Sequence, residues 1–358
     1  MSVASAIFFW GDSAMTVCAE VLRGLIVAAP GKKLVVADYS NIEGRVLAWF
    51  ANEEWKLQAY RDRDAGVGED IYKLQVQRAM GIPIEQITSF LRQQGKGMDL
   101  SLGYEGGVGA FLNVANSYQL DLVELGRSAP RTMSPELIEK GRGSWKWAVE
   151  QDETLDLPED IYVACAALKH AYRDSNARIA QLWEDLLICA KEAVRHAGHT
   201  FTCADGKVAM KSSNEWLAVQ IPSGRKIMFA KPKIETKAVI DKKTKLVKRD
   251  ANGDPVLRTQ LTALKSPGWV REGIYGGLLA NAITQGLSRD ILVDAMLDVD
   301  HCNYPIVLHV HDEIVAELDD SDERDHDDMI EVMLRRVERY NGLPLTAAGF
   351  TTKRYRKG

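Results

Sequence analysis

The order of apolar and polar residues along the chain predicts a mixture of strands and helices. A short β-branched run at 34–37 follows the turn at Pro30 and Gly31, which predicts a strand with Asp38 at its end. Apolar residues then recur at helical spacing from Ile42 to Phe50. We therefore expect a strand, a turn and a helix in this segment.

The middle of the chain has the periodicity of helices. Residues 85–103 are compatible with a helix, and residues 160–197 predict two long helices. A further helix is expected at 275–297. Two strands are then expected at 306–310 and 313–317, on either side of His311 and Asp312.

A basic region lies between residues 224 and 250, where lysine and arginine alternate with residues typical of strands. This pattern predicts an exposed hairpin or extended arm, with a turn at residues 252–255. Its basic residues are Arg225, Lys226, Lys231, Lys233, Lys237, Lys242, Lys243, Lys245, Lys248 and Arg249.

Composition limits the classes of protein that the chain can form. Its 358 residues are 46% hydrophobic and carry a net charge of −5, so a packed core is expected and any nucleic-acid binding must use local basic patches. Five scattered cysteines without a CxxC pair argue against a disulfide framework or a zinc site. No signal peptide or membrane span is expected, and a reducing cytoplasm fits best.

Two carboxylates stand at the edges of predicted strands, Asp38 in DYSNIEGR and Asp312 in HVHDEIVAEL. Anchoring on strands suits a pair of Mg²⁺ ions, which tolerate little movement of their ligands. Mg²⁺ takes few carboxylates and completes its shell with water and phosphate oxygens. The alternative interpretation is structural: Asp38 as a helix N-cap and Asp312 as a turn residue.

Between these acids, Arg92, Lys96, Leu100 and Tyr104 recur every four residues, which predicts one stripe on a helix. A guanidinium and an ammonium one turn apart suit a polyphosphate. A solvated helix face is the alternative interpretation of the same spacing.

These residues together resemble the family A DNA polymerases, and most of all their bacteriophage-type branch. The resemblance rests on three motifs in the family's order: DYS..E.R at 38–45, R...K...L...Y at 92–104, and VHDE at 310–313. It extends over nearly the whole chain. It implies an α+β fold in which an antiparallel palm sheet carries a large, mostly helical fingers insertion.

The resemblance also implies a two-metal site and a nucleotide site. Asp38 and Asp312 would hold two Mg²⁺ ions, with a carbonyl ligand from Tyr39 and support from Glu313. Arg92 and Lys96 would bind the nucleotide's β- and γ-phosphates, and Lys96 would serve the leaving group.

Further residues would select the sugar and contact DNA. Glu43 and Tyr104 would form a steric gate against ribose, although Glu43 also fits an ordinary carboxylate in the first turn of a helix. His311, Asn281, Gln285 and Arg225 would contact DNA, although structural roles are open for each. Leu100 departs from the family, because many members carry an aromatic residue there to face the nucleotide.

We expect three segments: an N-terminal part of the palm at 1–64, helical fingers at 65–215, and a C-terminal part of the palm with the basic hairpin at 216–358. Only 37 residues precede Asp38, so a thumb and a proofreading exonuclease are expected on a separate chain. The expected function is template-directed DNA synthesis from dNTPs on primer-template DNA, in a bacterial host's cytoplasm if a phage encodes it. A non-catalytic DNA-binding replisome subunit, a truncated remnant and a two-metal nuclease are the alternatives.

Overall fold

The chain folds into two compact units in this computed structural model, which describes residues 8–9, 11, 22–213, 215–240, 244–250, 252–265, 267–335 and 340–355. One unit comprises residues up to Ile42 and from Ser288 onward; the other comprises Glu43–Leu287. The predicted boundaries lie elsewhere, near residues 64 and 215, and the assignment of palm and fingers stays a prediction. Lys242 and Lys243 of the predicted basic region lie outside the described residues.

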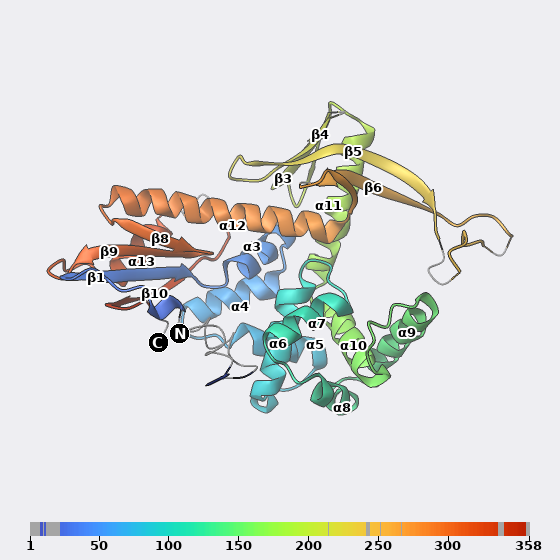
Figure 1. The fold of residues 1–358 in the computed structure, drawn as a ribbon, viewed down its shortest axis with the longest axis horizontal. Coiled ribbons are helices and arrows are strands. Elements are labelled where there is room, and N and C mark those ends of the chain that lie inside the picture. Colours follow the sequence, from blue (N-terminus) through green and yellow to red (C-terminus); the bar gives the residue numbers. More distant parts are fainter. Residues whose placement is uncertain are drawn as a thin grey trace. The chain divides into compact units, whose positions relative to one another are not determined.

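The helices and strands alternate in long blocks along the sequence (Figure 1). The helices are α3 (Ile42–Ala51), α4 (Glu54–Asp64), α5 (Ile71–Met80), the short 3₁₀ helix η2 (Ile84–Gln86), α6 (Ser89–Leu102), α7 (Val108–Ser117), α8 (Leu122–Thr132), α9 (Pro135–Gln151), α10 (Glu159–Ser175), α11 (Ala177–Arg195), α12 (Gly276–His301) and α13 (His326–Leu334). The strands are β1 (Lys32–Tyr39), β2 (Thr200–Cys203), β3 (Val208–Ser212), β4 (Trp216–Gln220), β5 (Lys226–Ala238), β6 (Leu257–Lys265), β7 (Val270–Ile274), β8 (Ile306–Val310), β9 (Glu313–Asp319) and β10 (Ala347–Thr352).

The first unit is built on a four-stranded sheet in the order β10-β1-β9-β8, with every pairing antiparallel. Four consecutive residues of β1, from Leu34 to Ala37, are buried. Successive side chains of a strand point to opposite faces, so both faces of the sheet are covered here, and α13 packs against β1 and β10. The predicted strands and the antiparallel sheet are therefore confirmed.

Helix α10 is the centre of the helical part of the second unit. Its residues from Ile161 to Leu168 are all buried, and it packs against α5, α8 and α9. A helix that is apolar on every side must be enclosed by its neighbours. The two helices predicted at 160–197 are confirmed as α10 and α11.

A six-stranded antiparallel sheet, with the strands in the order β2 to β7, completes the second unit. The sequence predicted only a hairpin after residue 224, whereas the sheet begins at Thr200, inside the segment expected to be mostly helical. Strands β2 and β3 are four and five residues long, which is too short for a clear period. Helix α11 packs against β2, β3, β4 and β5.

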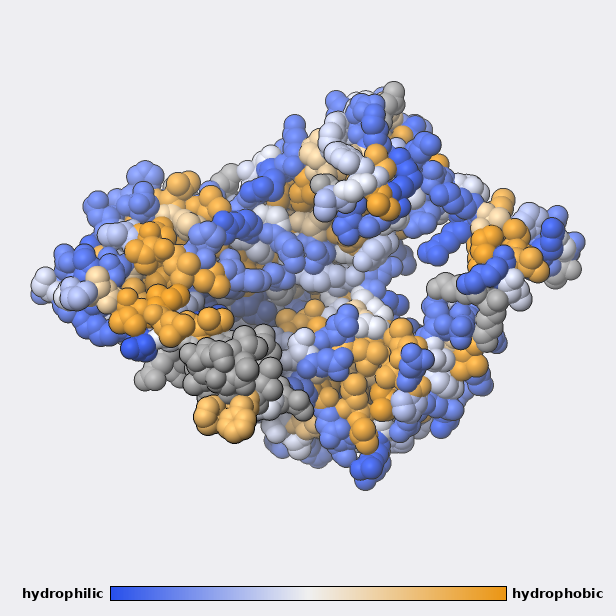
Figure 2. All heavy atoms as spheres, in the orientation of Figure 1, coloured by the Kyte–Doolittle hydropathy of each residue, from blue (hydrophilic) through white to orange (hydrophobic). Residues whose placement is uncertain are grey.

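Strands β5 and β6 continue beyond the rest of this sheet as an arm (Figure 1). Figure 2 shows apolar residues gathered at its far end, where Ile240, Leu246 and Leu257 are exposed. The predicted basic arm is thus present in the described residues.

No helix in the described part of the chain is long and apolar enough to cross a membrane.

Glycine permits the close packing of α6 on α5. A Cβ atom at Gly95 would lie 2.2 Å from the carbonyl oxygen of Tyr72, and one at Gly97 would lie 3.1 Å from the ring of Phe111. The contact at Gly95 is closer than real Cβ atoms make, and the carbonyl oxygen of Tyr72 belongs to the main chain, so it cannot move aside as a flexible side chain could. The Gly95-Lys96-Gly97 sequence therefore serves helix packing.

We expect Gly95→Ala to lower the free energy of unfolding by about 1–3 kcal/mol, because the added methyl group must push α5 and α6 apart. Gly143→Ala in α9 is the matched control, since its Cβ meets no atom within 4 Å. That change should raise stability by about 0.4–1 kcal/mol. Urea unfolding followed by circular dichroism would measure both, and equal effects would contradict the packing argument.

Candidate active site

Pairing of β1 with β9 brings the two predicted metal-binding acids side by side. Asp38 lies opposite Glu313 in the antiparallel register, and the backbone N–H of Tyr39 donates a hydrogen bond of 3.2 Å to the carbonyl of Asp312. Both acidic side chains are partly exposed, Asp312 at 29%. Two carboxylates more than 270 residues apart in the sequence thus stand at adjacent strand ends.

The turn between β8 and β9 presents His311 beside Asp312. His311 has a left-handed backbone with φ of 59° and is not part of either strand. Its side chain is 73% exposed, and its Nδ1 atom lies 3.6 Å from the Asp312 carboxylate. The imidazole is therefore exposed next to the Asp312 carboxylate.

Glu313 is held by Tyr355, a residue that no sequence pattern singled out. Its side chain is buried and accepts a hydrogen bond from the hydroxyl of Tyr355. Burial, together with this carboxylate, raises the pKa of Tyr355 to about 12. This hydrogen bond fixes the side chain of Glu313, the residue that follows Asp312. The only sequence signal for Tyr355 is an aromatic residue in a basic tail.

Tyr39 turns its side chain into the core. The ring is buried, and its hydroxyl donates a hydrogen bond of 2.8 Å to the carbonyl of Met333. Burial raises the pKa of Tyr39 above its ordinary value. Only the main chain of Tyr39 is consequently left for a ligand beside Asp38.

The donors at this place suit a hard cation. Among the described residues, no cluster of three or more histidine, cysteine, aspartate or glutamate side chains could hold a metal ion. Two carboxylates and a main-chain carbonyl are oxygen donors, and Mg²⁺ typically takes one or two carboxylates with water and phosphate oxygens. The residues present therefore fit Mg²⁺ in the company of a phosphate substrate.

Helix α6 carries the predicted phosphate-binding residues. Thr88 caps its first turn by accepting a hydrogen bond of 3.3 Å from the N–H of Leu91. One turn further, Arg92 donates a hydrogen bond of 2.8 Å to Asp70, and the ammonium of Lys96 lies 4.1 Å from the ring centre of Tyr118. The two cations lie on one helix, as predicted, and each already has a partner.

Asp70 is a second residue that sequence reasoning missed. Its carboxylate caps α5 by accepting hydrogen bonds from the N–H groups of Tyr72 and Lys73. Burial acts to raise its pKa, but the hydrogen bond from Arg92 and those from α5 leave the pKa below its ordinary value. Asp70 therefore stays ionised at neutral pH and is paired with the guanidinium of Arg92. The only sequence signal for Asp70 was its position just before a helical run, which is typical of an N-cap.

The predicted helical stripe is wrong at its fourth residue. Helix α6 ends at Leu102, so Leu100 lies on it, 40% exposed, whereas Tyr104 lies in the following turn. Glu105 has a left-handed backbone with φ of 62°, which a helix cannot contain. The four-residue spacing alone could not reveal where the helix stops.

Tyr104 and Glu43 nevertheless meet, as predicted. The Tyr104 hydroxyl donates a hydrogen bond of 3.2 Å to a carboxylate oxygen of Glu43 in the first turn of α3. Burial, followed by the nearby Glu43 charge, raises the pKa of Tyr104 well above its ordinary value. Both side chains are only partly buried, so the pair presents a surface to a ligand.

The start of α12 is packed against this turn. A Cβ atom at Gly277 would lie 2.1 Å from the carbonyl oxygen of Tyr104, and the N–H of Gly277 donates a hydrogen bond of 2.8 Å to Glu105. A Cβ atom at Gly276 would lie 2.0 Å from the carbonyl oxygen of Trp183. The paired glycines thus let α12 approach closely and hold Tyr104 in place.

The remaining predicted contacts lie on α12 and beside it. Asn281 and Gln285 are one turn apart and share a face of the helix, where Gln285 is exposed. Arg225, in the turn between β4 and β5, places its Cδ atom 3.9 Å from the Cβ position of Gly286. The structure therefore brings Arg225 to the same part of α12 as Gln285.

Known proteins that resemble this chain are DNA polymerases. The family described as DNA polymerase family A matches residues 14–116. The DNA polymerase of Bacillus phage SP02 is 31% identical over 350 residues, which are 95% of this chain and 44% of that protein. DNA polymerase I of Mycobacterium tuberculosis strain H37Rv is 34% identical over 84 residues, 23% of this chain and 9% of that protein. The chain thus spans less than half the length of these relatives.

A solved structure gives a similar result for the fold. The polymerase domain of Pol1 from M. smegmatis, solved in complex with a DNA primer-template and dNTP, matches 93% of this chain and 42% of that chain. The TM-score is 0.51 at 17% sequence identity. Residues 14–116 thus match DNA polymerase family A, most of the chain is similar to a phage DNA polymerase, and its fold is similar to that of a polymerase domain.

Proposed function

We propose that this chain catalyses template-directed transfer of deoxynucleotides to the 3′-hydroxyl of a primer, with Mg²⁺ as cofactor. The observation that carries the proposal is the placement of Asp38 next to Asp312 at adjacent strand ends. Two strands of one sheet hold these acids rigidly, which a metal-dependent phosphoryl transfer requires.

The acid pair and the main chain of Tyr39 would hold two Mg²⁺ ions. Such ions lower the pKa of an attacking hydroxyl and neutralise charge that develops at the α-phosphate. The hydrogen bond from Tyr355 fixes Glu313 behind the pair, so that the ligands keep their orientation. His311, exposed beside Asp312, is placed to contact the primer end.

The cations of α6 would bind the triphosphate. A phosphate oxygen can replace the Asp70 carboxylate as the acceptor for Arg92, because both accept forked hydrogen bonds from a guanidinium. Lys96, a compact point charge one turn away, would donate a proton to the departing pyrophosphate. Leu100, exposed on the same helix, offers the base an apolar contact in place of a ring.

Glu43 and Tyr104 would exclude ribonucleotides. Their hydrogen bond joins two elements into one wall, and a 2′-hydroxyl directed at it would meet filled space.

On the DNA side, Arg225, Asn281 and Gln285 would contact the primer-template duplex. A separate chain that supplies the thumb and exonuclease stays a prediction, which extension assays with and without proteins encoded beside this gene would test.

Primer extension with Mg²⁺, primed template and four dNTPs tests the proposal directly. We expect extension by the purified chain. In Asp38→Asn or Asp312→Asn we expect activity to fall by at least about 100-fold, because removing a metal ligand should cost more than removing a residue that only hydrogen-bonds to a ligand. Asp319→Asn, at the opposite end of β9, is the matched control and should extend normally. Full activity in either site variant would refute the assignment, and inactivity of the wild type would favour a non-catalytic DNA-binding subunit.

Lys96→Ala separates a polymerase from a two-metal nuclease, because hydrolysis needs no triphosphate contact. We expect nucleotide incorporation to fall by about 100-fold or more, as when one donor to a developing anion is removed. Lys146→Ala, an exposed lysine of α9, is the control and should leave incorporation unchanged. Steady-state incorporation and DNA degradation would be measured on the same preparations; degradation that Lys96→Ala leaves intact would favour the nuclease.

Glu43→Ala should increase the use of ribonucleotides relative to deoxynucleotides by about 10-fold or more, because it removes bulk beside the expected 2′-hydroxyl position. The control is Glu54→Ala, the first-turn carboxylate of the next helix, which is paired with Arg61 on the surface. Single-nucleotide incorporation with matched rNTP and dNTP pairs is the measurement. An unchanged ratio would mean that sugar selection resides elsewhere.

A further inference from the structure

The second sheet has one face without a covering element among the described residues. Along β4, Leu217 and Val219 are buried toward α11, whereas Trp216 and Gln220 are exposed on the other side. A groove of about 300 Å³ crosses this open face from β2 to β5. None of the catalytic or nucleotide-binding roles proposed above uses this face.

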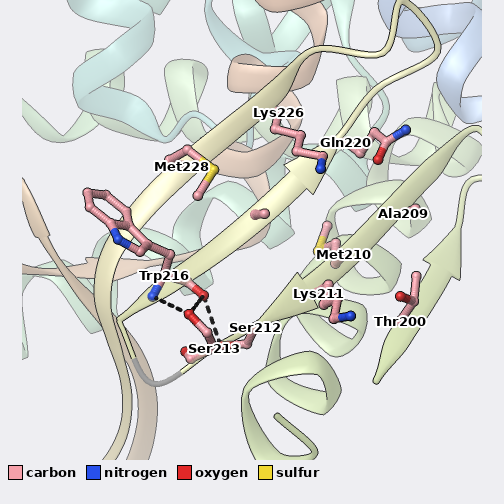
Figure 3. Close-up of a pocket in the computed structure, with 11 residues that line it drawn as sticks. Thr200, Ala209, Met210, Lys211, Ser212, Ser213, Trp216, Gln220, Lys226 and Met228 are labelled. Atoms are coloured by element: carbon pink, nitrogen blue, oxygen red, sulfur yellow. Dashed lines mark hydrogen bonds between the residues drawn. The ribbon is translucent and has the colours of Figure 1, made fainter. Parts of the chain in front are cut away.

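The groove has an apolar centre formed by strand pairing. Ala218 of β4 lies opposite Met228 of β5 on one side and opposite Lys211 of β3 on the other. Small alanines leave the floor low, and Trp216 and Met228 form a wall (Figure 3). Figure 2 shows apolar residues among hydrophilic ones at the top of the view, where these strands lie. The exposed indole and thioether offer a flat apolar surface to a planar ring.

The edges of the groove are basic. Lys211 and Lys226 are exposed, and no ion pair joins either to another of the described residues. Among the described residues that line the groove, none has a carboxylate. The neighbouring Lys231, by contrast, is paired with Glu215. Two lysines that have no acidic partner within the described part of the chain, next to an aromatic wall, favour an anionic ligand that carries planar rings.

The charge of the surrounding segment points to a polymer. Residues 200–275 contain fifteen lysines and arginines and seven acidic residues, a net charge of +8, although the whole chain carries −5. The positive charge is thus concentrated on the sheet and its arm. A polyanion would be attracted to this part of the chain and repelled by the rest.

We propose that the groove on β2–β5 binds single-stranded DNA, with a base stacked on Trp216 and neighbouring phosphates on Lys211 and Lys226. Single strands expose the faces of their bases, which a duplex conceals, and stacking with phosphate contacts is the usual way to hold them. The proposal rests on the proposed function in one respect: a copying enzyme meets unpaired template, which makes DNA the ligand.

Fluorescence anisotropy with a labelled oligo-dT and the full chain tests the groove. We expect Trp216→Ala to weaken binding about 10-fold, within the range for the loss of one stacked base. Trp216→Phe should keep most of the affinity, which guards against misfolding. Trp147→Ala in α9 is the matched control, since that side chain is 52% exposed against 42% for Trp216; it should bind like the wild type.

The salt dependence tests the lysines separately. For single strands, the slope of log K against log salt changes by about 0.7 for each phosphate contact. The double variant Lys211→Gln, Lys226→Gln should therefore flatten the slope by about 1.4. Undiminished affinity in Trp216→Ala, an unchanged slope, or tighter binding of RNA of matching sequence would overturn the proposal.

Binding needs no catalysis, so the two proposals can fail independently. Preparations that bind DNA through Trp216 but extend no primer would refute only the polymerase function. Preparations that extend a primer but bind oligo-dT equally well with and without Trp216 would refute only the groove, and would leave its open face to another partner.

Discussion

The antiparallel pairing of β1 with β9 is the interaction on which the catalytic proposal depends. Main-chain hydrogen bonds fix the register that places Asp38 opposite Glu313 and next to Asp312. A shift of one residue would exchange the two faces of β1 and turn Asp38 toward the opposite side. Because Leu34 to Ala37 are buried on both faces, such a shift would also disrupt the core, so the packing of apolar residues protects the position of the acids.

Close main-chain contacts have the same importance in the second unit. Gly95 lets α6 approach α5, and Gly277 lets α12 approach the turn that carries Tyr104. These contacts set the distance from Arg92 to Asp70 and from Tyr104 to Glu43. Arg92, Lys96 and Tyr104 each have a protein partner in this structure, so a nucleotide that bound to them would replace those partners.

The sequence predicted most of the first sheet and several contacts of the candidate site. The β-branched run before Asp38 and the alternating residues around His311 gave the strands, and the Glu43–Tyr104 contact followed from the resemblance. It did not reveal the start of the second sheet at Thr200, because β2 and β3 are too short for a clear period. Nor did it select Tyr355 or Asp70, whose importance lies in contacts with residues far along the chain.

By itself, the sequence determined which chemical groups the protein has and on which kind of element most of them lie. Periodicity is a local property, and so are the motifs on which the resemblance to the polymerase family rests. Only the tertiary structure decided that Tyr355 lies behind Glu313, that Arg92 is engaged by Asp70, and that Trp216 and Met228 form one wall of an open groove. Each of these depends on register and packing between distant segments, which are set by the free energy of the whole fold.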